Sequence, residues 1–318
     1  MRYTKLGRAG VEVSRVCLGC MNFGPVADES TSFAIMSDAI ERGVNFFDTA
    51  NVYGGRGKTE ELMGRWFAED GRRRDEIVLA TKVYGRMGEG VNDEGLSAYT
   101  IRKACEDSLR RLQTDRIDLY QMHHVDRSVR WEEIFETMER LRDEGKILYY
   151  GSSNFAAWNI TEAVVEAKYR GALGLVTEQS LYNLTKRDIE LEVAPACKRF
   201  GVGILPWSPL GGGVLAGTSE KGDRRSRPEA KKNAERHADR IAKYEALCEE
   251  SGEPPAKVAL AWTLANPAVT APIIGPRTLE QLESGVAAVD LELSQETLDK
   301  LDEIFPGPGN QAPEAYAW

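Results

Sequence analysis

Residues 43–54 read GVNFFDTANVYG, a short apolar run that ends in the acidic residue Asp48 and is followed by Tyr53. The same plan recurs further along the chain, where VLAT is followed by Lys82 and DLYQM by His123. Each run has the length of a buried strand and is followed by a longer segment with helical periodicity. This repetition predicts parallel strands that are joined by helices.

The rest of the chain continues the alternation. After a hairpin expected over Tyr3–Val13, eight strands are expected at Val16–Cys20, Val44–Asp48, Ile77–Lys82, Ile117–His123, Leu148–Ser152, Leu175–Gln179, Val202–Trp207 and Thr270–Ile274. The helices expected with them are Ser30–Arg42, Thr59–Ala68, Tyr99–Leu112, Trp131–Asp143, Ala156–Tyr169, Asp188–Phe200, Ala238–Ser251 and Leu279–Ala288. Eight strand–helix pairs predict the α/β class and a single (β/α)₈ barrel domain over residues 1–318, rather than an open sheet. Four of the helices are expected to end at glycines, namely Gly43, Gly145, Gly171 and Gly201.

Composition narrows the class of protein. The 318 residues are 42% apolar and 29% charged with a net charge of −9, which fits a soluble globular protein and disfavours nucleic acid or an anionic membrane as partner. No apolar run approaches a membrane span or a signal peptide, so a cytoplasmic location is expected. Five scattered cysteines predict no disulfide framework, and the pair Cys17 and Cys20 encloses the end of a buried strand, so no metal is expected. The expected partner is a small molecule, and the sequence is compatible with a homo-oligomer.

Two segments allow two interpretations each. Gly211–Asp239 forms a long loop after the seventh strand, beginning Gly-rich and continuing with many basic residues. It is either a solvated loop or a lid over a bound phosphate, because barrels often bind phosphate at this point. The tail Phe305–Trp318 either caps the barrel mouth or frays.

Asp48, Tyr53, Lys82 and His123 all follow or end strands, and the carboxyl ends of barrel strands meet at one mouth. A carbonyl that accepts hydride develops negative charge on oxygen and needs a proton donor. Tyr53 fits this role, since a neighbouring Lys82 ammonium favours the phenolate and is expected to lower the phenol pKa. Asp48 would keep Lys82 charged, and His123 would bond the carbonyl oxygen. The four residues together predict reduction of an aldehyde or ketone with Tyr53 as general acid.

The chain resembles the aldo-keto reductases along nearly its whole length. The motifs that carry the resemblance are GVNFFDTANVYG, VLATKV, SLRRLQTDRIDLYQMHHVD, GKILYYGSSNF, LPWSPLGGGVLAG and PIIGPRTLEQL. The resemblance implies a barrel that binds NADPH without a separate dinucleotide-binding domain, and a catalytic tetrad at Asp48, Tyr53, Lys82 and His123. His124 takes the place of the family's usual tryptophan. Since neighbours on a strand point to opposite faces, only one of the two histidines is expected to face the site.

The resemblance also assigns a cofactor site. It places Ser153, Asn154 and Gln179 against the nicotinamide carboxamide and Trp207 against the nicotinamide ring. Arg277 offers a bidentate fork to the 2′-phosphate, which favours NADPH over NADH. The remaining cofactor residues are Cys20, Met21, Ser208, Pro209, Leu210, Gly211, Arg227, Gly275 and Gln281. The chain departs from many relatives at Ser284 and Gly285 beside the adenine, and at Thr218, where some carry a phosphate-facing lysine.

Two alternatives remain. The potassium-channel β subunits share the barrel and bind NADPH as regulatory partners of a channel, but the family's catalytic histidine is replaced in them, so His123 favours an enzyme. Residues 91–112, VNDEGLSAYTIRKACEDSLRRL, also resemble reductases that act on nucleotide-linked deoxysugars. That interpretation predicts a basic patch beside the mouth for a diphosphate.

Overall fold

The computed structural model describes residues 1–217 and 228–309, and its centre is a barrel of parallel strands. In the described residues the barrel strands lie in the order β10-β3-β4-β5-β6-β7-β8-β9. The gap between β9 and β10 is bridged where Thr270 N–H donates to the Ile204 carbonyl at 2.8 Å. The strands are β3 (Cys17–Gly19), β4 (Phe46–Asp48), β5 (Val78–Val83), β6 (Ile117–Met122), β7 (Ile147–Ser153), β8 (Leu175–Leu181), β9 (Gly203–Trp207) and β10 (Ile273–Ile274). The predicted (β/α)₈ fold is confirmed.

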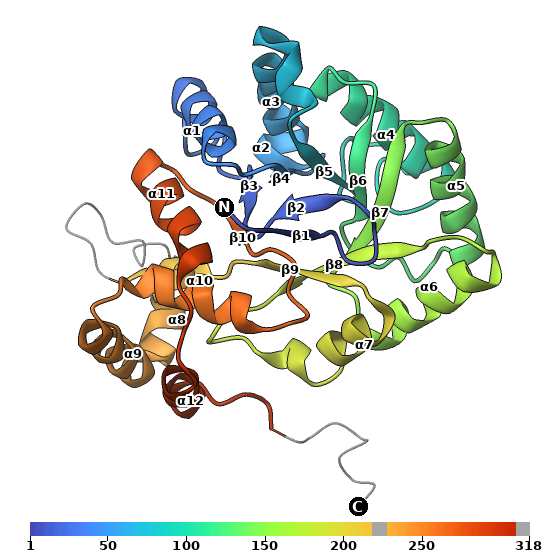
Figure 1. Cartoon of the computed structure of the whole chain (residues 1–318). Helices are drawn as coiled ribbons and strands as arrows, with labels where there is room; N and C mark the ends of the chain where they lie inside the picture. Colours follow the sequence, from blue (N-terminus) through green and yellow to red (C-terminus); the bar gives the residue numbers. More distant parts are fainter. Residues whose placement is uncertain (218–227, 310–318) are drawn as a thin grey trace, which may run out of the picture.

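An antiparallel hairpin, β1 (Tyr3–Lys5) and β2 (Glu12–Ser14), closes the amino end of the barrel. Leu6 and Val13 belong to the same buried apolar cluster as Leu119 of β6 and Val176 of β8. At Gly7 the backbone has φ +55°, and a Cβ would lie 1.9 Å from the Val176 carbonyl oxygen, so only glycine fits. Figure 1 shows the hairpin lying across the ring of strands, which leaves the carboxyl end of the strands as the open mouth.

The helices form the outer layer of the barrel (Figure 1). Ser97 shows how they begin, because its side chain accepts from Thr100 N–H as an N-cap. All four glycines expected to end helices have positive φ, which confirms their role. The helices are α1 (Glu29–Glu41), α2 (Tyr53–Arg56), α3 (Lys58–Glu69), α4 (Ala98–Leu112), α5 (Trp131–Asp143), α6 (Ala157–Tyr169), α7 (Val193–Phe200), α8 (Pro228–Arg236), α9 (Ala238–Ser251), α10 (Pro255–Ala265), α11 (Leu279–Ala287) and α12 (Gln295–Ile304).

Several predicted elements differ from those observed. The single helix expected over Asp188–Phe200 is divided into a 3₁₀ turn, Asp188–Glu190, and α7. Pro195 explains the break, since its ring clashes with the carbonyl four residues earlier and prevents a helix from continuing through Leu191. Helices α10 and α12 are not predicted, and α10 is apolar on nearly every side, which hides the helical period that sequence reading depends on.

The long loop after the seventh strand is partly helical. It begins with a 3₁₀ segment, Gly211–Ala216, and later contains α8. Residues 218–227 and 310–318 lie outside the described residues, and with them Thr218, Arg227 and most of the predicted tail segment. Phe305, where that segment begins, is buried and packs edge-on against Tyr244 with ring centroids 5.9 Å apart.

Within the described residues, no helix has both the length and the apolar character that a membrane crossing requires. All five cysteines are buried free thiols.

Candidate active site

A buried ion pair lies at the carboxyl ends of β4 and β5. Asp48 ends β4, and Lys82 is the last residue but one of β5. The Lys82 Nζ donates to Asp48 Oδ2 at 2.6 Å and to the Thr49 carbonyl at 2.9 Å, and the two side chains are only 0% and 3% exposed. Burial alone would lower the pKa of Lys82, but the Asp48 carboxylate and Tyr53 raise it above its usual value, so the ammonium stays charged.

The third donor of the Lys82 ammonium is directed to Tyr53. The Nζ–hydroxyl distance is 3.1 Å, and Nζ lies 4.7 Å from the centroid of the tyrosine ring. Tyr53 begins α2 and is half-buried. The expectation of a lowered phenol pKa is wrong, because burial, together with the nearby Asp48 charge, raises the pKa of Tyr53 by more than Lys82 lowers it. The phenol therefore holds its proton in this structure.

The His123 ring lies beside the Tyr53 ring. Its backbone N–H donates to the Val83 carbonyl at 2.8 Å, which fixes the residue directly after β6. The imidazole meets Tyr53 edge-on with centroids 5.9 Å apart. Burial first, and then the Lys82 charge and His124, lower the pKa of His123 to about 3. The ring is thus neutral near pH 7.

The prediction that the two histidines point to opposite faces is wrong. Their rings stack with an interplanar angle of 8° and centroids 5.3 Å apart. Strand β6 ends at Met122, so the alternation of a strand no longer applies at His123 and His124. His124 also meets Tyr84 edge-on, at 5.4 Å between centroids, and so extends the aromatic wall of the site.

Gln121 belongs to the site, although the sequence analysis does not single it out. Its amide donates to Asp48 Oδ1 at 2.9 Å, and the Gln179 amide donates to the same oxygen at the same distance. The sequence does carry a signal for it, since Gln121 is a polar residue in an otherwise apolar run, two positions before His123. In the structure its side chain is fully buried. The two glutamines complete the bonding of the carboxylate.

The four residues predicted for the nicotinamide end of the cofactor are connected across β7, β8 and β9. Trp207 Nε1 donates to Asn154 Oδ1 at 3.0 Å, and Asn154 Nδ2 donates to Ser153 Oγ at 3.0 Å. Ser153 in turn donates to the Gln179 carbonyl at 2.9 Å. Asn154 is exposed, and its backbone has φ +59°, a conformation that asparagine tolerates better than most residues.

The residues predicted along the pyrophosphate form a tight turn after β9. Ser208 has φ +53°, and its hydroxyl accepts from Gly212 N–H at 2.9 Å. The other members of this predicted group, Pro209, Leu210 and Gly211, complete the turn. In the loop after β3, Met21 is 55% exposed, whereas Cys20 is fully buried, so the cysteine side chain offers no surface to a ligand.

The residues predicted for the adenosine end gather at the start of α11. The Arg277 N–H donates to Gln281 Oε1 at 2.9 Å, and Asn22 Nδ2 donates to the Gly275 carbonyl at 3.0 Å. Gly285 has a packing reason, because a Cβ there would lie 2.8 Å from Ile274 Cδ1. The glycine allows α11 to pack close to β10.

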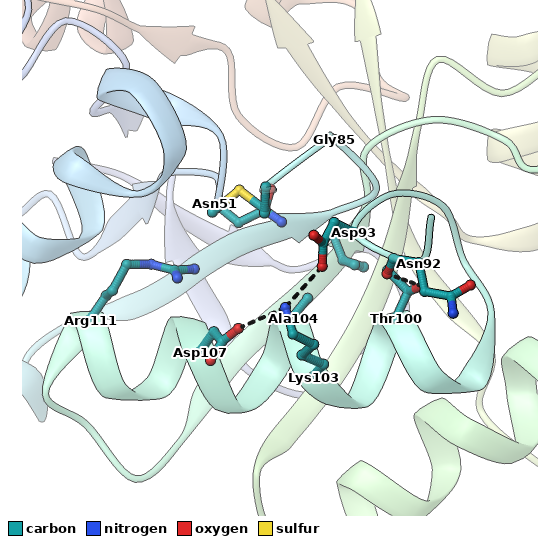
Figure 2. A pocket seen from close by; sticks show the side chains of 11 residues that line it. Asn51, Gly85, Asn92, Asp93, Thr100, Lys103, Ala104, Asp107 and Arg111 are labelled. Atoms are coloured by element: carbon teal, nitrogen blue, oxygen red, sulfur yellow. Dashed lines mark hydrogen bonds and ion pairs between the residues drawn. The ribbon is translucent and has the colours of Figure 1, made fainter. Parts of the chain in front are cut away.

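A small pocket lies beside the loop that carries Asn51 (Figure 2). Its walls are this loop, the β5–α4 loop and α4. Lys103 lies between Asp93 and Asp107 at 3.2 and 3.7 Å, as the dashed lines in Figure 2 show. Asn51 lines the pocket, and its buried Oδ1 has no hydrogen-bond partner among the described residues. The sequence analysis does not predict this pocket.

The sequence profile of the Aldo/keto reductase family matches residues 15–305. This match covers the barrel and the Asp48–Lys82–Tyr53 cluster at its mouth. The chain therefore belongs to the aldo-keto reductase family.

Three relatives illustrate the range of the family. The chain is 52% identical to the uncharacterized oxidoreductase YrpG of Bacillus subtilis over 100% of both chains. It is 34% identical to a probable voltage-gated potassium channel subunit beta of Arabidopsis thaliana, over 99% of this chain and 100% of the relative. It is also 34% identical to the norsolorinic acid reductase stcV of Emericella nidulans, over 94% of this chain and 80% of the relative.

Proposed function

We propose that this chain is a cytoplasmic enzyme that reduces an aldehyde or ketone to an alcohol with NADPH, and that Tyr53 is the general acid. The observation that carries the proposal is the Lys82 ammonium, which contacts both the Asp48 carboxylate and the Tyr53 hydroxyl at 2.6 and 3.1 Å. The Lys82 ammonium thus contacts both the Asp48 carboxylate, which keeps it charged, and the Tyr53 hydroxyl, which would release the proton.

The residues present fit a nicotinamide dinucleotide. An amide nitrogen has two N–H donors, and the bond to Ser153 uses one of those on Asn154, so the other can meet a carboxamide oxygen. Trp207 adds a half-buried aromatic ring beside this amide. At the other end, Arg277 directly precedes Thr278, the N-cap of α11, where backbone N–H groups and the helix dipole favour an anion. Arg277 and Gln281 would hold the 2′-phosphate.

The roles of the side chains follow from their geometry. When bound, the reduced nicotinamide supplies the hydride that the carbonyl carbon accepts. The carbonyl oxygen takes the Tyr53 proton as negative charge develops, and the Lys82 ammonium stabilises the phenolate that remains. Neutral His123 can donate one N–H to the same oxygen without competing for the proton. Asp48, held by Gln121 and Gln179, keeps Lys82 charged and in place.

The Tyr53→Phe variant tests the role of the phenol. Turnover with a panel of aldehydes and ketones, followed by NADPH absorbance, is expected to fall by a factor of about 10² to 10⁴. NADPH binding should stay near that of the wild type. Tyr120→Phe is the matched control, because the Tyr120 hydroxyl donates to the Ile101 carbonyl on the helix side of β6. Turnover within tenfold of the wild type would remove Tyr53 from its role.

The Arg277→Ala variant tests the cofactor. Loss of a charged phosphate partner is expected to weaken NADPH by about 10- to 100-fold while NADH changes little. Arg170→Ala removes an arginine that pairs with Glu139 on the outer helices, and it should affect neither cofactor. An equal loss of NADPH and NADH affinity would contradict the 2′-phosphate assignment.

A regulatory NADPH-binding subunit is the second candidate, favoured by the similarity to proteins named as probable potassium channel β subunits. His123 beside Tyr53 argues for the enzyme. Tight NADPH binding without turnover of any carbonyl in the panel would favour the regulatory role. Turnover confined to nucleotide-linked sugars would identify the substrate as a deoxysugar precursor.

A further inference from the structure

Glu178 is a fully buried carboxylate that the proposed reaction does not use. It lies on β8, and among the described residues its hydrogen-bond partners are neutral donors. Ser152 Oγ donates to one carboxylate oxygen, while Ser180 Oγ and Phe155 N–H donate to the other at 2.8 and 3.1 Å. Burying a carboxylate without an ion-pair partner lowers the stability of the folded protein, so the presence of Glu178 at this position indicates a specific role.

The barrel reaches this arrangement through an irregularity in strand pairing. Tyr150 pairs with Leu175, but Ser152 pairs with Glu178, so one extra residue of β8 is accommodated between these pairs. In a regular ladder Ser153 would lie beside Glu178. The extra residue brings Gln179 beside Ser153 instead and turns Glu178 toward the helix side with Ser152. The bulge thus keeps a carboxylate away from the mouth and places an amide there.

The donors that Glu178 accepts surround the turn after β7. Phe155 N–H is the backbone group that directly follows Asn154, whose φ is +59°. Ser152 precedes the pair Ser153 and Asn154 on the other side. The carboxylate therefore accepts hydrogen bonds from both ends of this turn, from Ser152 and from Phe155. The left-handed backbone of Asn154 lies between these two contacts.

We propose that Glu178 is a positioning residue, which fixes the turn carrying Ser153 and Asn154 and thereby orients the nicotinamide carboxamide. This inference rests on the proposed function, since it assumes that these two residues meet the cofactor. Trp207 is included in the same arrangement, because its indole N–H donates to Asn154.

The chemistry of the site explains why glutamate suits this task. A carboxylate is an acceptor on both oxygens and matches the hydroxyl and N–H groups that converge on it, whereas a glutamine would direct an NH₂ group at one set of donors. Burial raises the pKa of Glu178 to about 7, even though the bonds from Ser152, Ser180 and the adjoining backbone favour the ionised form and lower it.

The experiment compares the affinity of Glu178→Gln for NADPH and for 2′,5′-ADP, which carries the adenosine end without nicotinamide. Calorimetry is expected to show NADPH weakened by about tenfold and 2′,5′-ADP unchanged, because only the carboxamide end depends on the turn. Catalytic turnover should fall with it, and the Michaelis constant for NADPH should rise.

Asp118→Asn is the matched control. Asp118 is also a buried strand carboxylate that accepts a backbone N–H, from Leu79 at 2.8 Å, but it lies at the amino end of β6, away from the mouth. Its substitution is expected to lower the free energy of unfolding without changing the ratio of the two affinities. If Glu178→Gln fails to fold, Ser180→Ala removes a single donor and should weaken NADPH two- to threefold with 2′,5′-ADP unchanged.

The outcomes separate the two proposals. If the wild type binds neither NADPH nor NADH, the proposed function fails. If the wild type reduces carbonyls with NADPH but the variant weakens both ligands equally, or neither, the positioning role of Glu178 is overturned while the function stands.

Discussion

The two ends of strand β5 each have a buried ion pair, and the two pairs differ in what the cation does with its remaining donors. At the amino end Arg74 pairs with Asp118 at 2.8 Å, with both side chains 8% exposed. At the carboxyl end Lys82 pairs with Asp48 at 2.6 Å. The first pair lies where the barrel is closed, and the second lies at its mouth.

The other N–H donors of Arg74 form hydrogen bonds with two backbone carbonyls and one threonine hydroxyl. Its guanidinium bonds Thr114 Oγ1 at 3.0 Å and the carbonyls of Ile77 and Arg116 at 3.3 and 2.8 Å, which fixes the start of β5 against the start of β6. Lys82 directs one donor to a tyrosine hydroxyl instead. Burial of an ion pair therefore does not by itself indicate its role. The role depends on the group that receives the cation's remaining hydrogen bond, which is protein backbone or Thr114 for Arg74 and the Tyr53 hydroxyl for Lys82.

The largest effect is expected from breaking the pair at the mouth. Lys82→Met should lower turnover by a factor of about 10² to 10⁴, because the phenolate left by Tyr53 loses its cation. It should also lower the free energy of unfolding by about 3–5 kcal/mol, since Asp48 remains buried without a counter-ion. Turnover at saturating NADPH and urea unfolding measure the two quantities. A variant that loses this stability but retains at least a tenth of the activity would show that Lys82 has only a structural role.

Breaking the pair at the closed end should separate stability from catalysis. Arg74→Met is expected to cost about 3–5 kcal/mol of unfolding free energy and to leave turnover within about twofold at a temperature where the variant is folded. The double variant Arg74→Met, Asp118→Leu should recover part of this loss, because it removes both charges. A large fall in turnover with unchanged stability would contradict the division of roles between the two ends.

The smallest effect concerns His123 beside the functional pair. Because its pKa is lowered to about 3, its NMR signals should not titrate between pH 5 and 8. An unfolded histidine binds a proton near pH 6.5 while folded His123 does not, so its contribution to stability is present above pH 6.5 and is lost as the pH falls toward 3. His123→Gln should show a shallower loss of stability over this window. A midpoint near 6.5 for His123 would mean that the ring is exposed.

The positions of the barrel strands could be predicted from the sequence, but the contacts between side chains of different strands and loops could be predicted less well. Strand ends within one residue of Asp48, Lys82 and His123 could be predicted because hydrophobic runs and their polar terminators are local signals. The stacking of His124 on His123 could not, since it depends on β6 ending one residue earlier than expected. The net rise in the pKa of Tyr53 was also missed, because burial is a property of the packed mouth.

The sequence by itself determined the barrel, the polar residues at its mouth and the kinship with aldo-keto reductases, because periodicity and motif order are written along the chain. Only the tertiary structure decided which groups touch. Gln121 and Gln179 meet at one Asp48 oxygen from separate strands, and the bulge in β8 sets Gln179 rather than Glu178 beside Ser153. Such contacts depend on strand register and on the loss of water around charged groups, and neither is fixed until the barrel closes.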